Sequence, residues 1–151
     1  MPINRGLMTR NSDEWTTPRW LFDRLNERFL FSIDVAATRE NRLCDAWYDS
    51  HDDGLTQSWE GERVFCNPPY SQISLWAHKF AFEAKNAALI VALIPARVDT
   101  RWWQDHIVKA DLVHFIRGRL RFGDSKNSAP FPSALAFWFG LERLCRRPTC
   151  P

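Results

Sequence analysis

Hydrophobic and polar residues follow two periods along the chain, one typical of helices and one of strands. Apolar residues recur at helical spacing in residues 18–29 and again between Ile73 and Ala84, and Thr100 is placed to cap a helix that runs to about Ala110. Short apolar runs predict strands at residues 31–36, 63–66, 88–94, 112–116 and 133–139. This alternation predicts an α/β fold, a three-layer sandwich with a mostly parallel sheet.

The same pattern predicts which large side chains are buried. Trp76 falls on the apolar face of its helix, whereas Lys79 and Glu83 fall on other faces. Trp102 and Trp103 are adjacent, so we expect at least one of them to face outward. Most of the eight tryptophans are expected in the core.

Length and composition favour one globular domain. The chain has 151 residues, of which 45% are hydrophobic and 25% charged. The longest apolar run has ten residues, about half a membrane span, and the polar residues 1–15 do not resemble a secretory signal. The four cysteines form no C-x-x-C pair, so no metal site is expected. We expect a single domain at residues 1–140, a basic tail at residues 141–151, no membrane association and a cytoplasmic location.

Charge is divided unevenly along the sequence. Residues 1–96 carry a net charge of −3 and residues 97–151 a net charge of +5. The basic half is either an ordinary solvated face or a surface for a polyanion. Arg119 and Arg121 alternate with apolar residues, so both can point to one side of a loop or ribbon. The candidates for polyanion contacts are Arg97, Arg119, Arg121 and Lys126.

The tetrapeptide Asn67-Pro68-Pro69-Tyr70 is the strongest candidate for a functional site. It follows the strand at residues 63–66 and precedes a helix, where ligands bind in open α/β sheets. Two prolines make the segment rigid, so the Asn67 side-chain oxygen and the Pro68 carbonyl can act as convergent acceptors for a planar exocyclic amine. Tyr70 offers an aromatic face to an extruded base. The alternative is a strand-to-helix turn that the prolines merely shape.

The motif and several other blocks, in this order, resemble the phage-encoded DNA N6-adenine methyltransferases, a Dam-like family that uses S-adenosylmethionine. The resemblance covers nearly the whole chain and implies a Rossmann-like methyltransferase fold that acts on duplex DNA. The blocks are Asp13–Pro18, Ile33–Ala37, Asp53–Leu55 with Trp59, the Asn67–Tyr70 motif, Ile94–Arg97 with Asp99 and Thr100, and Phe131–Leu135.

The resemblance implies a role for each matching residue. Asn67, Pro68, Pro69 and Tyr70 take the catalytic and base-stacking positions. Three residues take cofactor positions: Thr17 contacts the methionine portion, Asp34 faces the amino group and Asp53 accepts from the adenine amine.

Three of the implied cofactor contacts have alternatives or differ from the family pattern. Thr17 precedes a proline and is also placed to cap the helix at residues 18–29. The loop after the first strand, Ala36–Asn41, has no glycine, so it should approach a cofactor less closely than a glycine-rich loop or hold it differently. The acid that holds the ribose is either Asp45 or Asp49.

The leading hypothesis is methyl transfer from S-adenosylmethionine to the N6 amine of adenine in duplex DNA, by a monomer or homodimer that reads its target through loops. A related alternative changes the acceptor to cytosine N4, RNA adenine or a protein glutamine amide. Another alternative is a non-catalytic DNA-binding module of the same fold. The absence of glycine from the loop Ala36–Asn41 is the feature that is consistent with this alternative.

Overall fold

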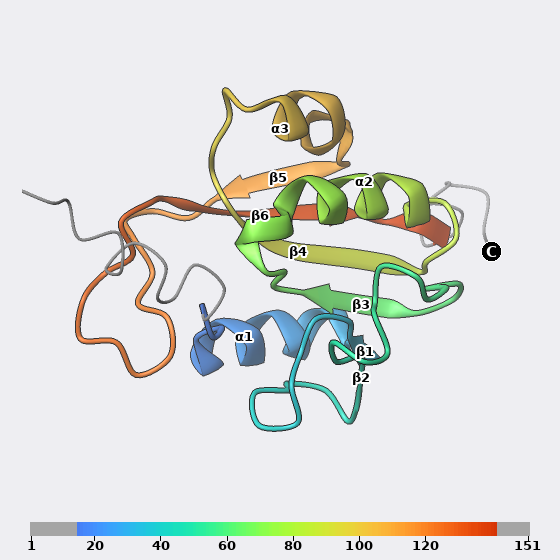
Figure 1. The fold of residues 1–151 in the computed structure, drawn as a ribbon, viewed down its shortest axis with the longest axis horizontal. Coiled ribbons are helices and arrows are strands. Elements are labelled where there is room, and N and C mark those ends of the chain that lie inside the picture. The colour runs from blue at the N-terminus through green and yellow to red at the C-terminus, as the bar shows by residue number, and fades with distance from the viewer. Residues whose placement is uncertain (1–14, 142–151) are drawn as a thin grey trace, which may run out of the picture.

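A computed structural model describes residues 15–141 of the chain. Its strands are β1 (Ile33–Asp34), β2 (Ala46–Trp47), β3 (Arg63–Cys66), β4 (Leu89–Pro95), β5 (Leu112–Phe115) and β6 (Ser133–Trp138). They form a six-stranded sheet in the order β2–β1–β3–β4–β6–β5 (Figure 1). Strands β2, β1, β3 and β4 pair in parallel, and β6 runs antiparallel to both β4 and β5. The expected mostly parallel α/β sheet is confirmed.

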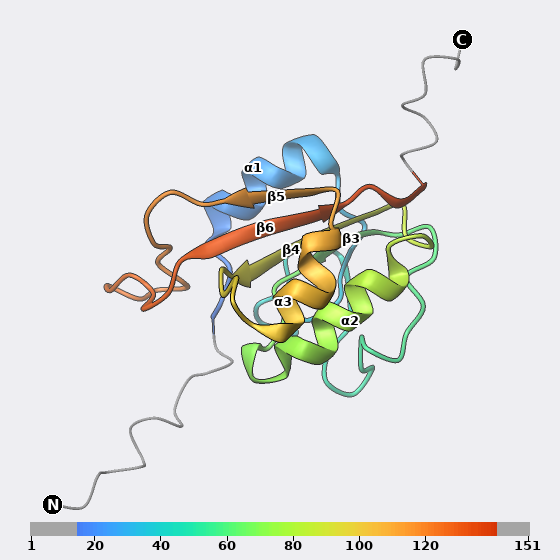
Figure 2. The ribbon, with the colours of Figure 1, turned by 90° about the horizontal axis from the view of Figure 1, so that it is seen from above.

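Helices cover both faces of the sheet. The helix α1 (Arg19–Phe29) lies on one face, and α2 (Ile73–Glu83) and α3 (Arg101–His106) lie on the other (Figure 2). Side chains of β4 alternate accordingly: the odd-numbered residues from Leu89 to Leu93 pack in one cluster with Phe22 of α1, and the even-numbered residues pack in the other with Phe80 of α2. Because both faces are covered, β4 is apolar and buried throughout.

The predicted elements agree with the structure to within a few residues, with three differences. The predicted strand at residues 31–36 is reduced to β1, and the helix after Thr100 ends at His106 and continues as the 3-10 turn η3 (Ile107–Lys109). The strand β2 was not predicted, because its two residues lie at the edge of the sheet and are not buried. Of the predicted tail 141–151, all but Leu141 lies outside the described residues.

The expectation that Thr17 caps α1 is wrong. The N-cap residue is Pro18, and no side chain caps the helix. The Pro18 carbonyl accepts hydrogen bonds from the N–H groups of Leu21 and Phe22, at 3.0 and 3.2 Å. The hydroxyl of Thr17 is therefore available for a different partner.

The expectation that Trp102 or Trp103 faces outward is also wrong, because both side chains are buried. The short α3 packs against α2, and the ring of Trp103 stacks on Phe115 of β5 with 6.1 Å between ring centroids. Neighbours on two sides of α3 thus bury two adjacent side chains. Trp76 is buried as predicted, whereas Trp20 is exposed.

Lys79 and Glu83, which the pattern placed away from the apolar face of α2, are buried and form an ion pair. The Lys79 Nζ donates to the Glu83 Oε1 at 2.7 Å and to the carbonyl of Gln57 at 2.6 Å, and it lies 5.2 Å from the ring centroid of Trp59. The two side chains are only 10% and 3% exposed. The pair connects α2 to the loop before β3.

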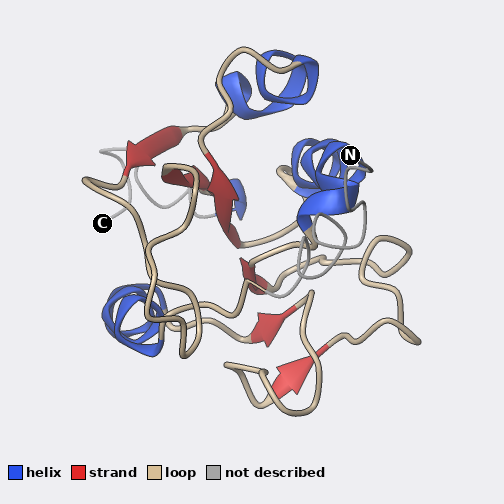
Figure 3. Ribbon diagram, turned by 60° about the vertical axis from the view of Figure 1, so that its left-hand side comes forward, coloured by secondary structure: helices blue, strands red, loops and turns tan. Residues whose placement is uncertain are grey.

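The strand order reverses beside β1, since the chain passes from β1 to β2 on one side and then to β3 on the other. Figure 3 shows the short strands set among long loops. The carboxyl ends of β1 and β3 meet at one edge of the sheet because the two strands are parallel neighbours. Within residues 15–141, no helix is long and apolar enough to cross a membrane.

We predict that Lys79→Met lowers the free energy of unfolding by about 3 kcal/mol, because it leaves the Glu83 carboxylate buried without its cation. Urea unfolding of the variant and the unchanged chain measures the difference. The double variant Lys79→Met/Glu83→Leu is the control and should recover most of the loss, since no charge then stays buried. A single variant as stable as the unchanged chain would contradict the prediction.

Candidate active site

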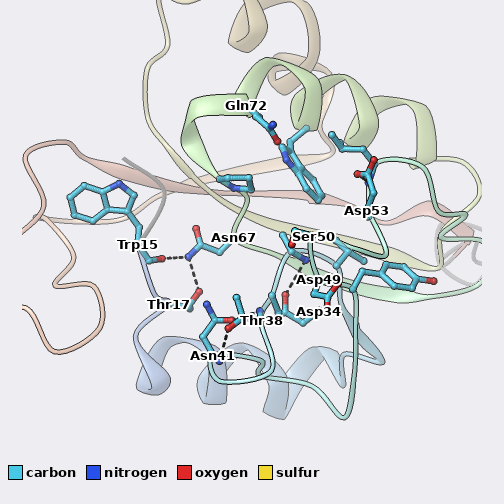
Figure 4. A pocket seen from close by; sticks show the side chains of 18 of the residues that line it. Trp15, Thr17, Asp34, Thr38, Asn41, Asp49, Ser50, Asp53, Asn67 and Gln72 are labelled. Carbon is cyan, nitrogen blue, oxygen red and sulfur yellow. Dashed lines mark hydrogen bonds between the residues drawn. The ribbon is translucent and has the colours of Figure 1, made fainter. Parts of the chain in front are cut away.

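A cavity of about 610 Å³ lies where the strand order reverses, outside the carboxyl ends of β1 and β3. This volume suits a small-molecule ligand, and the position is the one that open α/β sheets use for ligand binding. Four segments line the cavity (Figure 4): Trp15–Thr17; Asp34–Thr38 with Asn41 and Leu43; Tyr48–Ser50 with Asp53–Leu55; and Asn67, Pro69, Gln72, Leu75 and Trp76.

The side-chain amide of Asn67 has a defined orientation in this cavity. Its Nδ2 donates to the main-chain carbonyl of Trp15 and, at 2.9 Å, to the Oγ1 of Thr17. The Oδ1 points away from both partners (Figure 4). This oxygen is buried, and no donor within residues 15–141 reaches it. Such an acceptor is costly unless a ligand supplies the missing hydrogen bond.

The other three residues of the predicted motif follow Asn67 in the chain, and Pro68 and Tyr70 are not among the residues that line the cavity. Pro68 is buried, Pro69 lines the cavity, and Tyr70 begins the 3-10 turn η2 (Tyr70–Gln72) that leads into α2. The Tyr70 ring packs edge-on against Phe131, with 5.6 Å between ring centroids. Burial raises the pKa of the Tyr70 hydroxyl well above its usual range, so the hydroxyl stays neutral.

Asp34, at the end of β1, supplies a buried carboxylate to the cavity. Only 4% of the residue is exposed, and burial raises the pKa of its carboxyl to about 6. The N–H groups of Leu43 and Ala36 donate to this carboxyl at 3.3 and 3.4 Å and oppose the rise. Above pH 6 the cavity therefore holds a desolvated negative charge, which favours a cationic ligand group.

A second acidic segment also lines the cavity (Figure 4). Asp53 is exposed and adopts a left-handed conformation with φ 53°. Asp49 also lines the cavity, and backbone hydrogen bonds from the N–H groups of Asp52 and His51 lower the pKa of its carboxyl. Of the two candidates for a ribose contact, Asp49 is at the cavity and Asp45 is not among its lining residues.

The glycine-free loop after β1 lines the cavity despite its composition. Ala36, Ala37 and Thr38 are all lining residues. The loop is held by reciprocal hydrogen bonds, since the N–H of Thr38 donates to the Asn41 Oδ1 at 2.7 Å and the N–H of Asn41 donates to the Thr38 Oγ1 at 3.2 Å. The loop therefore belongs to the candidate ligand site although it has no glycine.

The segment that contains Asp53 and Gly54 comes close to the residue after β1, and this contact requires a glycine at position 54. A Cβ at this position would lie 2.2 Å from the Val35 carbonyl oxygen and 3.1 Å from the ring of Trp76. The absence of a side chain allows the acidic segment to pack directly on the end of β1.

Sequence reasoning missed Trp76 as a site residue, because its helical spacing indicated only a core position. Its side chain is buried and lines the cavity, and its Nε1 finds no acceptor within the described part of the chain. The polar residues Thr38, Asn41, Ser50 and Gln72 were also missed, because irregular loops and helix starts carry no periodic signal.

The four predicted polyanion contacts are exposed and lie outside the cavity lining. Arg119 and Arg121 alternate with the buried Leu120 and Phe122, as predicted. Lys126 lies in the same loop between β5 and β6, and Arg97 follows β4.

This loop also contacts the segment that holds Asn67. The ring of Trp15 packs edge-on against Phe122 and Phe131, at centroid distances of 5.4 and 5.1 Å. The N–H of Gly123 donates to the carbonyl of Thr16 at 2.8 Å.

Comparison with known proteins gives one family and two relatives. Residues 6–136 match the family model described as DNA N-6-adenine-methyltransferase (Dam). A protein of Escherichia phage T1 named DNA N-6-adenine-methyltransferase is 28% identical over 130 residues, which cover 85% of this chain and 55% of the relative. A protein of the same name from Haemophilus phage HP1 (strain HP1c1) is 25% identical over 120 residues, which cover 76% of this chain and 69% of the relative. The chain thus spans about half the length of the T1 protein.

We predict that ionisation of Asp34 destabilises the folded chain. The folded state binds this proton more tightly than the unfolded state, whose carboxyl titrates near 3.8. The cost therefore appears as pH rises from about 4 to 6, reaches about 2–3 kcal/mol and stays constant above pH 6. Urea unfolding should measure this cost. Between pH 4 and pH 7.5, the free energy of unfolding of Asp34→Asn should rise by that amount relative to that of the unchanged chain. A difference that does not depend on pH would contradict the prediction.

Proposed function

The chain belongs to the DNA N-6-adenine-methyltransferase (Dam) family, and we propose that it transfers a methyl group from S-adenosylmethionine to the N6 amine of adenine in duplex DNA. The observation that carries the proposal is the buried Oδ1 of Asn67, which has no hydrogen-bond partner within residues 15–141 and is held at the cavity by the two hydrogen bonds that Nδ2 of the same amide donates. An exocyclic amine supplies the donor that this oxygen lacks.

The fold supports the same assignment. We propose that residues 1–140 form a single methyltransferase domain of the Rossmann-like class. Three features support this proposal. The sheet is parallel from β2 to β4, and β6 runs antiparallel to both of its neighbours, β4 and β5. Helices cover both faces of the sheet, and a cavity lies where the strand order reverses.

The residues present fit S-adenosylmethionine. Asp34 offers a buried carboxylate for the cationic amino group, and Thr17, which is buried and lines the cavity, is the residue proposed to contact the methionine portion. Asp53 is proposed to accept from the adenine amine. The unpartnered Nε1 of Trp76 adds a donor for an oxygen or nitrogen of the ligand. When bound, the cofactor supplies a methyl group on a positively charged sulfur.

The chemistry of the motif follows from two fixed acceptors. The amine of adenine is a poor nucleophile because its lone pair is delocalised into the ring. In our proposal the Asn67 Oδ1 and the Pro68 carbonyl each accept one of its N–H groups, which favours tetrahedral geometry and localises the lone pair. The same dipoles stabilise the positive charge that develops on N6 before it releases a proton. Tyr70 is proposed to stack on the extruded base, with Pro69 shaping the turn.

Duplex DNA is proposed to approach from the loop between β5 and β6. Arg119, Arg121 and Lys126 project from this loop, whose buried side packs on Trp15 and therefore next to the motif. Arg97 is close enough to Tyr70 that its charge acts on the Tyr70 hydroxyl. Exposed arginines at this position suit phosphates and base edges alike.

We predict that Asn67→Ala lowers kcat by about 10²- to 10³-fold and leaves cofactor affinity nearly unchanged, because it removes a dipole that acts on the developing charge. The assay incubates the chain with methyl-labelled S-adenosylmethionine and separate DNA, RNA and protein acceptors, and digests the DNA to nucleosides. Label should appear in N6-methyl-2′-deoxyadenosine from the DNA. Label only in RNA, protein or another base would change the acceptor, and no transfer with intact cofactor binding would favour a non-catalytic module.

We predict that Arg119→Ala/Arg121→Ala weakens binding to duplex DNA and flattens its salt dependence. The loss of two phosphate contacts should reduce the slope of log K against log salt concentration by about 1–2. Fluorescence anisotropy at several salt concentrations measures this slope. Arg24→Ala/Arg28→Ala, two exposed arginines of α1, is the matched control. An unchanged slope in the first variant would place the DNA surface elsewhere.

A further inference from the structure

We infer that Thr17 and the main-chain carbonyl of Trp15 are positioning groups that hold the Asn67 amide with its oxygen toward the ligand, and that this arrangement requires asparagine at position 67. The inference rests on the proposed function in one respect, because the proposed function gives the Asn67 Oδ1 its role in methyl transfer. The arrangement itself is a property of the unliganded chain and can be tested without any reaction.

The two partners determine which end of the amide faces them. A main-chain carbonyl only accepts hydrogen bonds, so the group opposite the Trp15 carbonyl must be a donor. The Thr17 hydroxyl accepts the second bond at 2.9 Å. Together they use the amide nitrogen, and a flipped amide would bring its oxygen against the Trp15 carbonyl. The Oδ1 is thereby kept free of partners within residues 15–141.

The positioning groups are themselves held in place. Thr17 is only 7% exposed, and the ring of Trp15 packs edge-on against two aromatic rings of the loop that joins β5 and β6. Between them, Thr16 accepts a main-chain hydrogen bond from Gly123 of the same loop. Pro18 restricts the backbone directly after Thr17. Residues 15–17 therefore form a rigid partner for the amide, and little reorganisation is needed when the amine binds.

This geometry distinguishes asparagine from aspartate. Toward an amine, a carboxylate oxygen is at least as good an acceptor as an amide oxygen. A carboxylate has no N–H, however, so the oxygen that replaces Nδ2 would face the Trp15 carbonyl, which cannot donate to it, and only the Thr17 hydroxyl could turn to donate. Only its protonated form could donate to the Trp15 carbonyl and still present a free oxygen to the cavity. The surroundings of position 67, and not the reaction itself, thus select asparagine.

The first test compares Thr17→Val with Thr17→Ser. Valine keeps the shape of the side chain but removes the acceptor, so kcat at saturating cofactor should fall about tenfold, the value of one hydrogen bond. Serine should restore it. A lost cofactor contact would instead raise the KM for S-adenosylmethionine. A Thr17→Val variant with unchanged kcat would overturn the inference, whatever its KM.

The second test follows the Asn67 side-chain amide by ¹⁵N NMR in the unliganded chain. Its pair of signals is identified because it disappears in Asn67→Asp. Both protons should exchange slowly with solvent, and Thr17→Val should speed the exchange of one of them at least tenfold. Thr16→Val, the matched control in the next residue, should leave the pair unchanged. Fast exchange in the unchanged chain would overturn the inference. If that chain transfers no methyl group, the proposed function fails, but these signals still decide the positioning.

The third test uses the pH dependence of Asn67→Asp. At pH 8 its kcat at saturating cofactor should be at least tenfold below that of the unchanged chain, and it should rise as pH falls toward 5.5. The kcat of the unchanged chain should not rise in this range. A variant as active as the unchanged chain at pH 8, or one whose kcat falls with pH, would overturn the inference. This arm does not depend on whether Thr17→Val folds.

Discussion

The reversal of strand order beside β1 is the constraint on which the site depends. Because β2 and β3 lie on opposite sides of β1, the segments that follow β1 and β3 diverge and leave a cavity between them. The strand β1 ends at the buried Asp34, and Asn67 directly follows β3. Two polar groups that are far apart in sequence therefore face one cavity, and neither could be desolvated in this way at an exposed strand end.

Both groups lower the stability of the folded chain. Burial raises the pKa of Asp34 to about 6, and the Asn67 Oδ1 is buried without a donor from residues 15–141. Polar groups of this kind are usually satisfied within the protein, and exceptions concentrate at functional sites. The surrounding structure compensates with an apolar β4 that is buried on both faces.

Residue pattern predicted the sheet, its helices and the cavity position, because these follow from periodicity and from the place of the tetrapeptide after β3. The prediction failed where the same local residue pattern is compatible with two different structural roles. Thr17 before a proline is typical of a helix cap, yet its hydroxyl accepts from Asn67, 50 residues away. The pattern placed Lys79 and Glu83 away from the apolar face of their helix, yet both are buried, and Lys79 contacts Gln57 and Trp59 from another segment. Such long-range partners leave no trace in local periodicity.

The loop between β5 and β6 gives a physical link between the proposed DNA surface and the amide of Asn67. Its exposed arginines alternate with buried residues, and Phe122 and Phe131 on the buried side hold the ring of Trp15. The carbonyl of Trp15 in turn accepts from Asn67. A shift of this loop would therefore move the partner that orients the amide. The residues that line the cavity all belong to the acidic half of the chain, but the orientation of the Asn67 oxygen depends on packing from the basic half.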